Sequence, residues 1–301
     1  MDKRSGPVGS LALVLLRGGG DLASGVALRL HRVGIQVVIT ELAQPLAVRR
    51  AVSFAETVYE GRHLVEGVAA RLAKPEQVPA ALEAGEIPVL VDPNVDILTN
   101  SQSTNYQFPV VVDARITKQP PVPLPVSVPL HIGLGPGFHA GVNCHAAIET
   151  RRSHTLGRVY WDGATQPDSG QPEGDPRRVL RAPSDGIFMG HKQIGEHCEP
   201  GELIAEIQSP IENRQSKIVS PLPGVLRGLL RDGVHVAKGM KIGDIDPRAD
   251  PSACFLVSDK ALAIGGAVLE AILTREEIRE KLFTAPPGIR GQAGTKEHKG
   301  F

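Results

Sequence analysis

The chain has 301 residues, and its 33 Lys and Arg residues balance 33 Asp and Glu residues, so its formal net charge is zero. This balance argues against a general nucleic-acid binder, which carries a basic patch or stripe. An aromatic content of 4% argues against a stacking surface for single strands. The length allows one large domain or two smaller ones.

Three cysteines, Cys144, Cys198 and Cys254, lack the spacing of a metal site and are typical of buried thiols in a reducing compartment. The first apolar run, residues 11–16, is too short for a signal peptide and ends in a glycine turn. No run approaches the roughly 20 apolar residues of a membrane span. We therefore expect a cytoplasmic protein without a membrane partner.

Three elements are predicted in order from the start of the chain. The continuous apolar run over residues 11–16 predicts a strand that is buried on both faces of a parallel sheet. After a glycine-rich turn, the apolar spacing over residues 22–32 predicts a helix, and residues 35–41 predict a second strand. This order indicates an α/β fold in which a Rossmann-like parallel sheet domain spans residues 10–155.

The glycine turn predicts a phosphate site. Gly18, Gly20 and Ala23 fit the G-x-G-x-x-A pattern, in which glycines permit a tight turn and a close approach of the backbone to a pyrophosphate. Glu41 stands where an acid would bind a ribose hydroxyl. Asp21 leaves a second interpretation open, because a carboxylate repels a phosphate and suits a helix cap instead. In that case the glycines only form a tight turn.

Charged residues follow other predicted elements. Arg49 and Arg50 suit a phosphate or a carboxylate, and equally a solvated helix face. Two further strand-like runs end in Asp92 and in Asp113, and Arg115 follows the second run. The carboxyl ends of parallel strands face the ligand crevice, although Asp also ends strands in ordinary turns.

A second glycine-rich loop lies within residues 128–150. Gly135 and Gly137 would let a ligand touch the backbone, and His139 and Asn143 would supply hydrogen-bond partners. The histidines of this region match no common metal-binding spacing, so we expect no metal site.

An internal repeat marks a second domain at residues 181–248. Residues 182–207 align without a gap to residues 220–245, and prolines, turn glycines and a closing isoleucine recur. The pattern resembles the biotinyl/lipoyl barrel-sandwich hybrid, a small all-β fold. In such carrier domains a lysine lies in the hairpin between the halves. This chain has Asn213 there, and Lys217 comes four residues later, so we expect no biotin or lipoate.

The remaining segments connect or end these domains. Residues 156–180 have the Gly, Pro and Asp content of a linker. Residues 256–283 have the apolar spacing of a C-terminal helix. Residues 1–9 and 284–301 are expected to be disordered.

Several long motifs carry a family resemblance. The segments RGGGDLASGVALRLHRVG, VVVDARI and IGLGPGFHAGVNCHAAIETRRSHTLGRVYW resemble the YqeB-type family of the selenium-dependent molybdenum hydroxylase system, which is distantly related to the XdhC-type factors that mature xanthine dehydrogenases. The resemblance covers residues 11–275. It implies a role in cofactor handling or insertion beside a molybdenum enzyme. The candidate cofactor-binding residues, from the glycine pattern and the resemblance together, are Gly18, Gly19, Gly20, Asp21, Ala23, Glu41, Arg49, Arg50, Asp113, Arg115, Gly135, Gly137, His139 and Asn143.

Three functions remain open. The first is an accessory or maturation factor that serves a molybdenum hydroxylase apoenzyme and binds molybdopterin or its dinucleotide. The second is an NAD-linked oxidoreductase, for which His139 and His145 are the acid–base candidates. The third is a scaffold or carrier-like binding module without lipoate. The sequence shows no convincing nucleophile, metal set or acid–base pair, so we favour the maturation factor and assign no catalytic residue. A homo-oligomer is left open as well, because the sequence does not indicate an oligomeric state.

Overall fold

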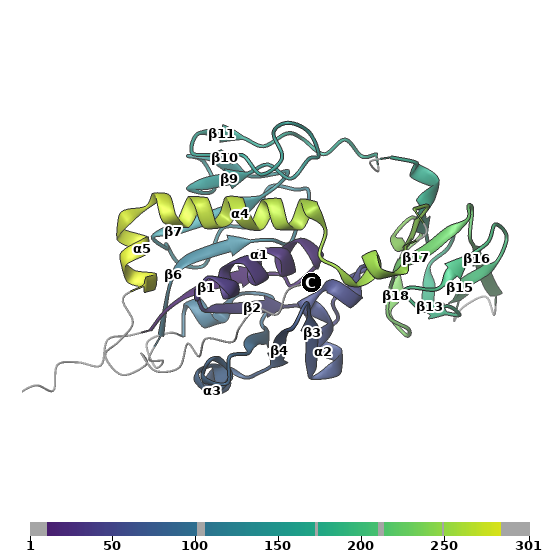
Figure 1. The fold of residues 1–301 in the computed structure, drawn as a ribbon, viewed down its shortest axis with the longest axis horizontal. Helices are drawn as coiled ribbons and strands as arrows, with labels where there is room; N and C mark the ends of the chain where they lie inside the picture. Colours follow the sequence, from purple (N-terminus) through teal and green to yellow (C-terminus); the bar gives the residue numbers. More distant parts are fainter. Residues whose placement is uncertain (1–10, 101–105, 172–173, 210–213, 249, 284–301) are drawn as a thin grey trace, which may run out of the picture.

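The computed structural model describes residues 11–100, 106–171, 174–209, 214–248 and 250–283. The tails expected to be disordered and the hairpin position Asn213 lie outside these residues. Figure 1 shows a larger lobe built on a broad sheet and a smaller β lobe beside it. No helix in the described part of the chain has the length and apolarity needed to span a membrane.

A nine-stranded sheet forms the larger lobe, in the order β10-β9-β7-β6-β1-β2-β5-β4-β3. Its strands are β1 Leu11–Arg17, β2 Val37–Glu41, β3 Arg62–Val65, β4 Val68–Leu72, β5 Ile87–Val91, β6 Tyr106–Asp113, β7 Leu130–Leu134, β9 Ala146–Ile148 and β10 Val159–Tyr160. The strands from β9 to β4 pair in parallel, whereas β3 and β10 pair antiparallel at the two edges. The apolar run of β1 is explained by its central position, where both faces are buried.

The expected fold class is wrong, because the main sheet is mixed and not a Rossmann-like parallel sheet. The connections between parallel strands also differ from those of a Rossmann-like fold, in which helices join the strands. No helix occurs among residues 114–145, all of which are described, although β6, β7 and β9 run parallel. The proline-rich residues 118–129 explain the first of these crossovers, since proline lacks a backbone N–H and disrupts a helix interior.

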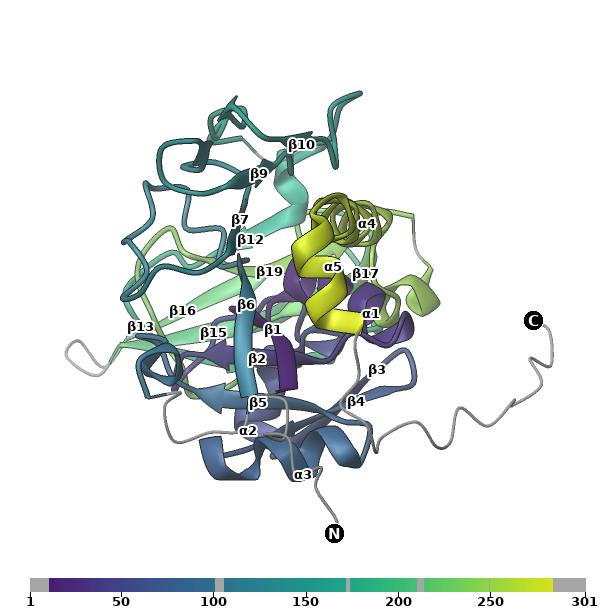
Figure 2. The same cartoon turned by 90° about the vertical axis from the view of Figure 1, so that its left-hand side faces the viewer.

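Helices cover both faces of this sheet. They are α1 Asp21–Arg32, α2 Thr57–Glu60, α3 Val78–Glu83, α4 Asp259–Thr274 and α5 Glu276–Phe283. Figure 2 shows α1, α4 and α5 on one side of the sheet. Val14 and Leu16 of β1 share a core with these three helices, whereas Leu13 and Leu15 pack on the opposite side with α3. The helix expected over residues 256–283 is thus two helices.

Helix α4 packs against α1 through glycines. A Cβ atom added to Gly25 would lie 2.7 Å from the carbonyl carbon of Ala261, and one added to Gly265 would lie 2.7 Å from the carbonyl oxygen of Gly25. Real Cβ atoms do not approach this closely, so the two backbones require glycine here. The last long helix of the chain is therefore held tightly against the first.

Two four-stranded antiparallel sheets form the smaller lobe around one core. One has the order β12-β19-β17-β14 and the other β16-β15-β13-β18. The strands are β12 Val179–Arg181, β13 Gly186–Gly190, β14 His197–Cys198, β15 Leu203–Ser209, β16 Arg214–Val219, β17 Gly224–Leu229, β18 His235–Val236 and β19 Lys241–Asp246. The assignment to a barrel-sandwich hybrid rested on the repeat and gains no further support.

The two copies of the repeat exchange strands in this lobe. The short strand β14 of the first copy pairs with β17 of the second, and β18 of the second copy pairs with β13 of the first. A separate pair of strands, β8 His139–Ala140 and β11 Gly163–Ala164, lies in the larger lobe. Short 3-10 helices cover Arg50–Val52, Phe54–Glu56, Pro75–Gln77, Asp96–Leu98, Pro176–Arg178 and Pro251–Phe255.

Two neighbouring glycines of α4 test the helix contact. Gly265→Ala is expected to lower the free energy of unfolding by about 1–3 kcal/mol, because the new methyl group overpacks the contact with α1. Gly266→Ala is the matched control, since its Cβ would meet nothing within 4 Å. The control should gain about 0.5–1 kcal/mol from helix propensity. Urea unfolding followed by circular dichroism measures both, and equal effects would contradict the close contact.

Candidate functional site

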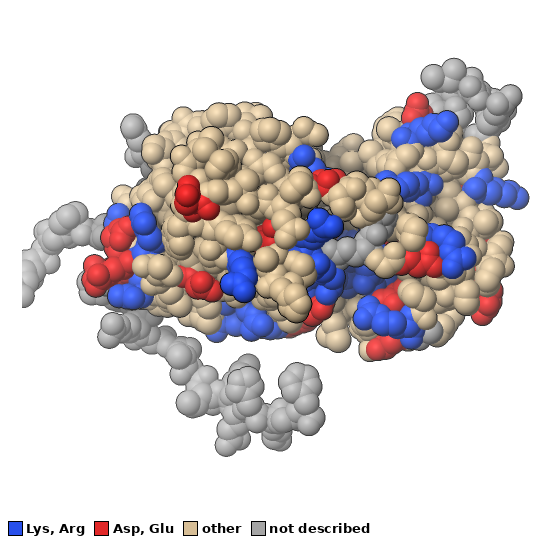
Figure 3. Space-filling model, turned by 90° about the horizontal axis from the view of Figure 1, so that it is seen from above, with Lys and Arg blue, Asp and Glu red and all other residues tan. Residues whose placement is uncertain are grey.

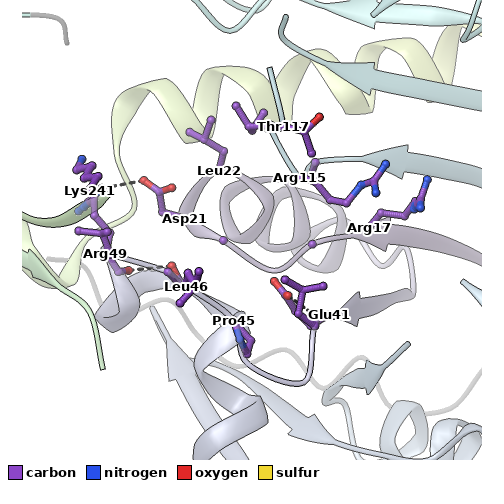
Figure 4. A pocket seen from close by; sticks show the side chains of 18 of the residues that line it. Arg17, Asp21, Leu22, Glu41, Pro45, Leu46, Arg49, Arg115, Thr117 and Lys241 are labelled. Carbon is purple, nitrogen blue, oxygen red and sulfur yellow. Dashed lines mark hydrogen bonds and ion pairs between the residues drawn. The ribbon is translucent and has the colours of Figure 1, made fainter. Parts of the chain in front are cut away.

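A cavity of about 630 Å³ lies between the two lobes, where β1, β2 and β6 end (Figure 4). Six of its lining residues are Arg or Lys and three are Asp or Glu. Figure 3 shows blue side chains gathered in the hollow between the lobes. The charged lining residues are Arg17, Asp21, Glu41, Arg49, Asp92, Arg115, Arg178, Arg227 and Lys241.

The glycine turn between β1 and α1 forms one wall of the cavity. Gly18 has a φ of +92°, which favours glycine, and its N–H donates to the carbonyl oxygen of Thr40 at 2.8 Å. A Cβ on Gly19 would lie 2.9 Å from the backbone nitrogen of Ala55. A Cβ on Gly20 would meet nothing within 4 Å, and Gly20 lines the cavity. The first two glycines therefore shape the turn, and the third leaves open space.

The start of α1 carries no side-chain cap. Gly20 is the N-cap residue, and no side chain accepts a hydrogen bond from the first turn. Asp21 lies instead with its carboxylate 3.8 Å from the guanidinium of Arg49. Asp21 therefore makes no side-chain cap, although it lies in the first turn of α1, where a carboxylate favours the helix dipole. The first N–H groups of a helix have no partner within it, so this open end is suited to an anion.

Glu41 uses both carboxylate oxygens on the backbone. Oε1 accepts from the N–H of Gly19 and Oε2 from the N–H of Leu42, each at 2.7 Å. Burial raises the pKa of Glu41, and the two backbone hydrogen bonds oppose the shift. The carboxylate thus secures the end of β2 to the glycine turn, while its role as a ribose ligand stays a prediction.

Two buried arginines line the cavity on opposite sides of the glycine turn (Figure 4). The exposed fraction is 5% for Arg17 and 8% for Arg49. Arg17 donates to Asp113 at 3.2 Å, and Arg115 holds the same carboxylate through two hydrogen bonds of 2.9 and 2.6 Å. The Nε atoms of Arg17 and Arg49 have no partner within the described residues. Buried donors are normally satisfied, so these two Nε atoms are exceptions within the described residues.

The smaller lobe adds three further cations. Arg178, Arg227 and Lys241 surround Asp244, which is fully buried. The Nε atom of Arg227 donates to Asp244 at 3.0 Å, and the ammonium of Lys241 lies 4.0 Å from it. Burial lowers the pKa of Lys241, Asp244 opposes the shift, and the neighbouring Arg178 adds to it. One carboxylate therefore organises three cations at the mouth of the cavity.

The lobes are joined beside this cavity. The N–H of Leu229 donates to the carbonyl oxygen of Val48 at 2.8 Å, and Arg50 donates to the carbonyl oxygen of Leu229 at 3.2 Å. Arg231 pairs with Glu56 and lies 4.9 Å from the ring centroid of Tyr59. Arg50 thus belongs to the junction of the lobes and does not line the cavity.

The structure brings together only part of the predicted site. The candidates that line the cavity are Gly18, Gly20, Asp21, Glu41, Arg49 and Arg115. The candidates that contact or pack behind the lining are Gly19, Ala23 and Asp113. The candidates outside the lining are Arg50, Gly135, Gly137, His139 and Asn143.

The second glycine loop is closed by its own hydrogen bonds. Asn143 accepts from the N–H of His139 and donates to the carbonyl oxygen of Gly137, each at 2.9 Å. His145 accepts from the N–H of His131 at 2.8 Å. These polar side chains hold the loop together and lie outside the cavity. No group of three or more His, Cys, Asp or Glu that could hold a metal occurs in the described ranges.

Several cavity residues were missed from the sequence. The missed charged residues are Arg17, Arg178, Arg227 and Lys241, and Asp92 was noted without being assigned. Arg17 could have been predicted from the sequence, because it directly precedes the glycines at the end of a predicted strand. The repeat held another: Arg227 and Lys241 of the second copy stand where the first copy has Met189 and Leu203.

The chain was compared with known proteins. No family model matches it. It is 44% identical over 278 residues to the uncharacterized protein YqeB of Escherichia coli (strain K12), an alignment that takes in 91% of this chain and 49% of that protein. The chain is thus similar to YqeB over most of its own length, which supports the YqeB family. This confirms the family resemblance, while the link to a molybdenum hydroxylase stays a prediction. The chain spans about half the length of this relative.

Solved structures give only distant likenesses. An aspartoacylase family protein from Mesorhizobium loti is 12% identical, with 78% of this chain and 84% of that chain covered and a TM-score of 0.26. The product-bound ectoine utilization protein EutE (DoeB) from Ruegeria pomeroyi is also 12% identical, with 77% and 56% covered and a TM-score of 0.23. Neither likeness bears on the function of this chain.

A buried histidine behind the cavity predicts a pH dependence. His131 of β7 is buried, and its Nε2 atom has no partner among the described residues. Burial lowers its pKa from 6.5 to about 4. Between these two pH values the unfolded chain binds more protons at this residue than the folded chain. Stability is therefore lost as the pH falls from 6.5 to about 4, by up to about 1.4 kcal/mol per pH unit.

The measurement is the free energy of unfolding across this range for the wild type and for His131→Gln. The wild type should show the steeper loss towards acid, and the two slopes should coincide above about pH 7. Equal slopes at every pH would contradict the prediction.

Proposed function

We propose that the cavity between the two lobes, called the cleft below, binds a phosphate-bearing ligand of the nucleotide or pterin type. One observation carries the proposal: six Arg and Lys side chains line the same cavity as the uncapped start of α1. The first N–H groups of a helix lack partners within it, and both these groups and the cations favour an anion. A phosphate in this cavity would be held by side-chain charge and by backbone donors together.

The rest of the cavity supports the same class of ligand. Cationic side chains exceed carboxylates in the lining, and Glu41 already accepts two backbone hydrogen bonds. Leu22, Pro45, Leu46 and Ile116 supply apolar wall that would suit a ring system. The volume of about 630 Å³ lies within the range of small-molecule sites.

We infer further that the protein serves as an accessory factor in the maturation of a selenium-dependent molybdenum hydroxylase. The motif resemblance to the YqeB-type family of the selenium-dependent molybdenum hydroxylase system supports this role. The cofactors of such enzymes end in a phosphate or a dinucleotide, which suits the cleft. The hydroxylase apoenzyme would be the partner, and molybdopterin or its dinucleotide the ligand. His139 and His145 lie outside the cavity lining, which favours this role over an NAD-linked oxidoreductase.

Gly20→Val tests the site directly. The branched side chain would enter the open space where the ligand is proposed, and the backbone of Gly20, with φ −62° and ψ 179°, accepts valine without strain. Ligand binding should weaken at least about tenfold, or about 1.4 kcal/mol, with stability retained. Mass spectrometry of wild type and variant purified from the native host measures the retained ligand.

Gly19→Val is the contrasting control, because its Cβ would meet the backbone of Ala55 and should destabilise the fold. Equal ligand occupancy in the wild type and Gly20→Val would count against the site.

Deletion of the gene tests the role. We expect molybdenum hydroxylase polypeptide at normal abundance, with low activity and a depleted cofactor, because the apoenzyme would lack its loading partner. Restoration by the wild-type gene but not by the Gly20→Val gene would tie the role to the cleft. Normal hydroxylase activity in the deletion strain would contradict the proposed function, and so would a robust NAD-dependent reaction by the purified protein.

A further inference from the structure

A second cavity of about 320 Å³ adjoins the first. Ile116, Arg178 and Lys241 line both cavities, so the two cavities lie side by side. The second cavity is bounded by the first turn of α4, by β12 and by the loop that follows β9. Its charged lining residues are Lys118, Arg151, Asp168, Arg178, Arg181, Lys241 and Lys260.

Cations outnumber carboxylates here even more than in the first cavity. Asp168 is the one lining carboxylate that the structure describes, and it pairs with Lys118 at 3.1 Å. Arg151 donates to the amide oxygen of Gln166 at 3.3 Å, and Arg181 donates to a backbone carbonyl. The ammonium of Lys260 makes no hydrogen bond or ion pair within the described part of the chain. Arg151, Arg181 and Lys260 thus come from three separate segments, and each lines the second cavity without a carboxylate partner among the described residues.

Without an anion this arrangement is unfavourable mainly at the half-buried Lys241 and Lys260, because Arg151 and Arg181 are exposed to water. Lys260 lies in the first turn of α4, where the helix dipole disfavours a cation. Like charges in one small cavity repel one another, and the shared Lys241 already has its pKa lowered by burial. The loop after β6 adds strain, because Ile116 and Lys118 have φ values of +52° and +62°. Costs of this kind concentrate where a ligand is bound.

We propose that the second cavity binds a second phosphate group of the same ligand, so that the two cavities together accept an elongated molecule with two separate anionic groups. This inference rests on the proposed function, since the first group would lie at the glycine turn. Arg178 and Lys241 would lie between the two groups, where both cavities meet. A single mononucleotide-sized phosphate ester would leave the second cationic cavity unfilled.

Inorganic pyrophosphate is the probe that separates the two anion sites. Calorimetric titration at low ionic strength should give two binding events with the wild type, because screening by salt is then weak. Arg181→Gln combined with Lys260→Gln should weaken one event at least about tenfold and leave the other unchanged. Gly20→Val should remove the other binding event, the one that the double variant leaves unchanged. Lys238→Gln combined with Lys281→Gln is the matched control, since both lysines are exposed and line neither cavity.

Each outcome bears on one proposal or on both. A single event that Gly20→Val removes and the Arg181 and Lys260 variant retains would overturn the second site and keep the first. A single event that Gly20→Val retains and the Arg181 and Lys260 variant weakens would overturn the proposed function. Equal weakening in the control variant would show a general charge effect and overturn the second site. Absence of any binding by the wild type would overturn both.

Discussion

The contact between α1 and α4 determines where the functional residues lie. Gly25 and Gly265 let the two helix backbones approach closely, so the chain that leaves the smaller lobe is fixed onto the larger one. Helix α1 also begins at the glycine turn, and Arg49 of the larger lobe donates to backbone carbonyls just before α4. The contact of these two glycines therefore acts together with the direct contacts between the lobes, such as that of Val48 with Leu229, to hold the cationic side of the cleft in place.

Buried carboxylates then arrange the cations that face the ligand. Asp113 holds Arg17 and Arg115 on one side of the glycine turn, and Asp244 holds Arg178 and Arg227 on the other. Such buried pairs add little net stability, because desolvation offsets the attraction. Their value is positional: each guanidinium is held in one orientation before a ligand arrives, so less conformational entropy is lost on binding.

Local patterns in the sequence predicted local structure well. The apolar run, glycines and helical spacing from residue 11 to residue 41 correspond to β1, α1 and β2, and Gly18 does adopt a positive φ. The global fold was wrong because the edge strands β3 and β10, whose sequences carry no signal of direction, pair antiparallel and make the sheet mixed. Three of the six cationic residues that line the first cavity could not be predicted, since Arg178, Arg227 and Lys241 reach it only through the packing of one lobe on the other.

The exchange of short strands joins the two repeat copies into one unit, because each sheet of the smaller lobe contains a strand from the other copy. The copies nevertheless carry different side chains at matching positions. Arg227 and Lys241 of the second copy line the cavity, whereas the first copy has Met189 and Leu203 at these positions. The internal repeat is therefore symmetric in its backbone pairing and asymmetric in the charge that it presents to a ligand.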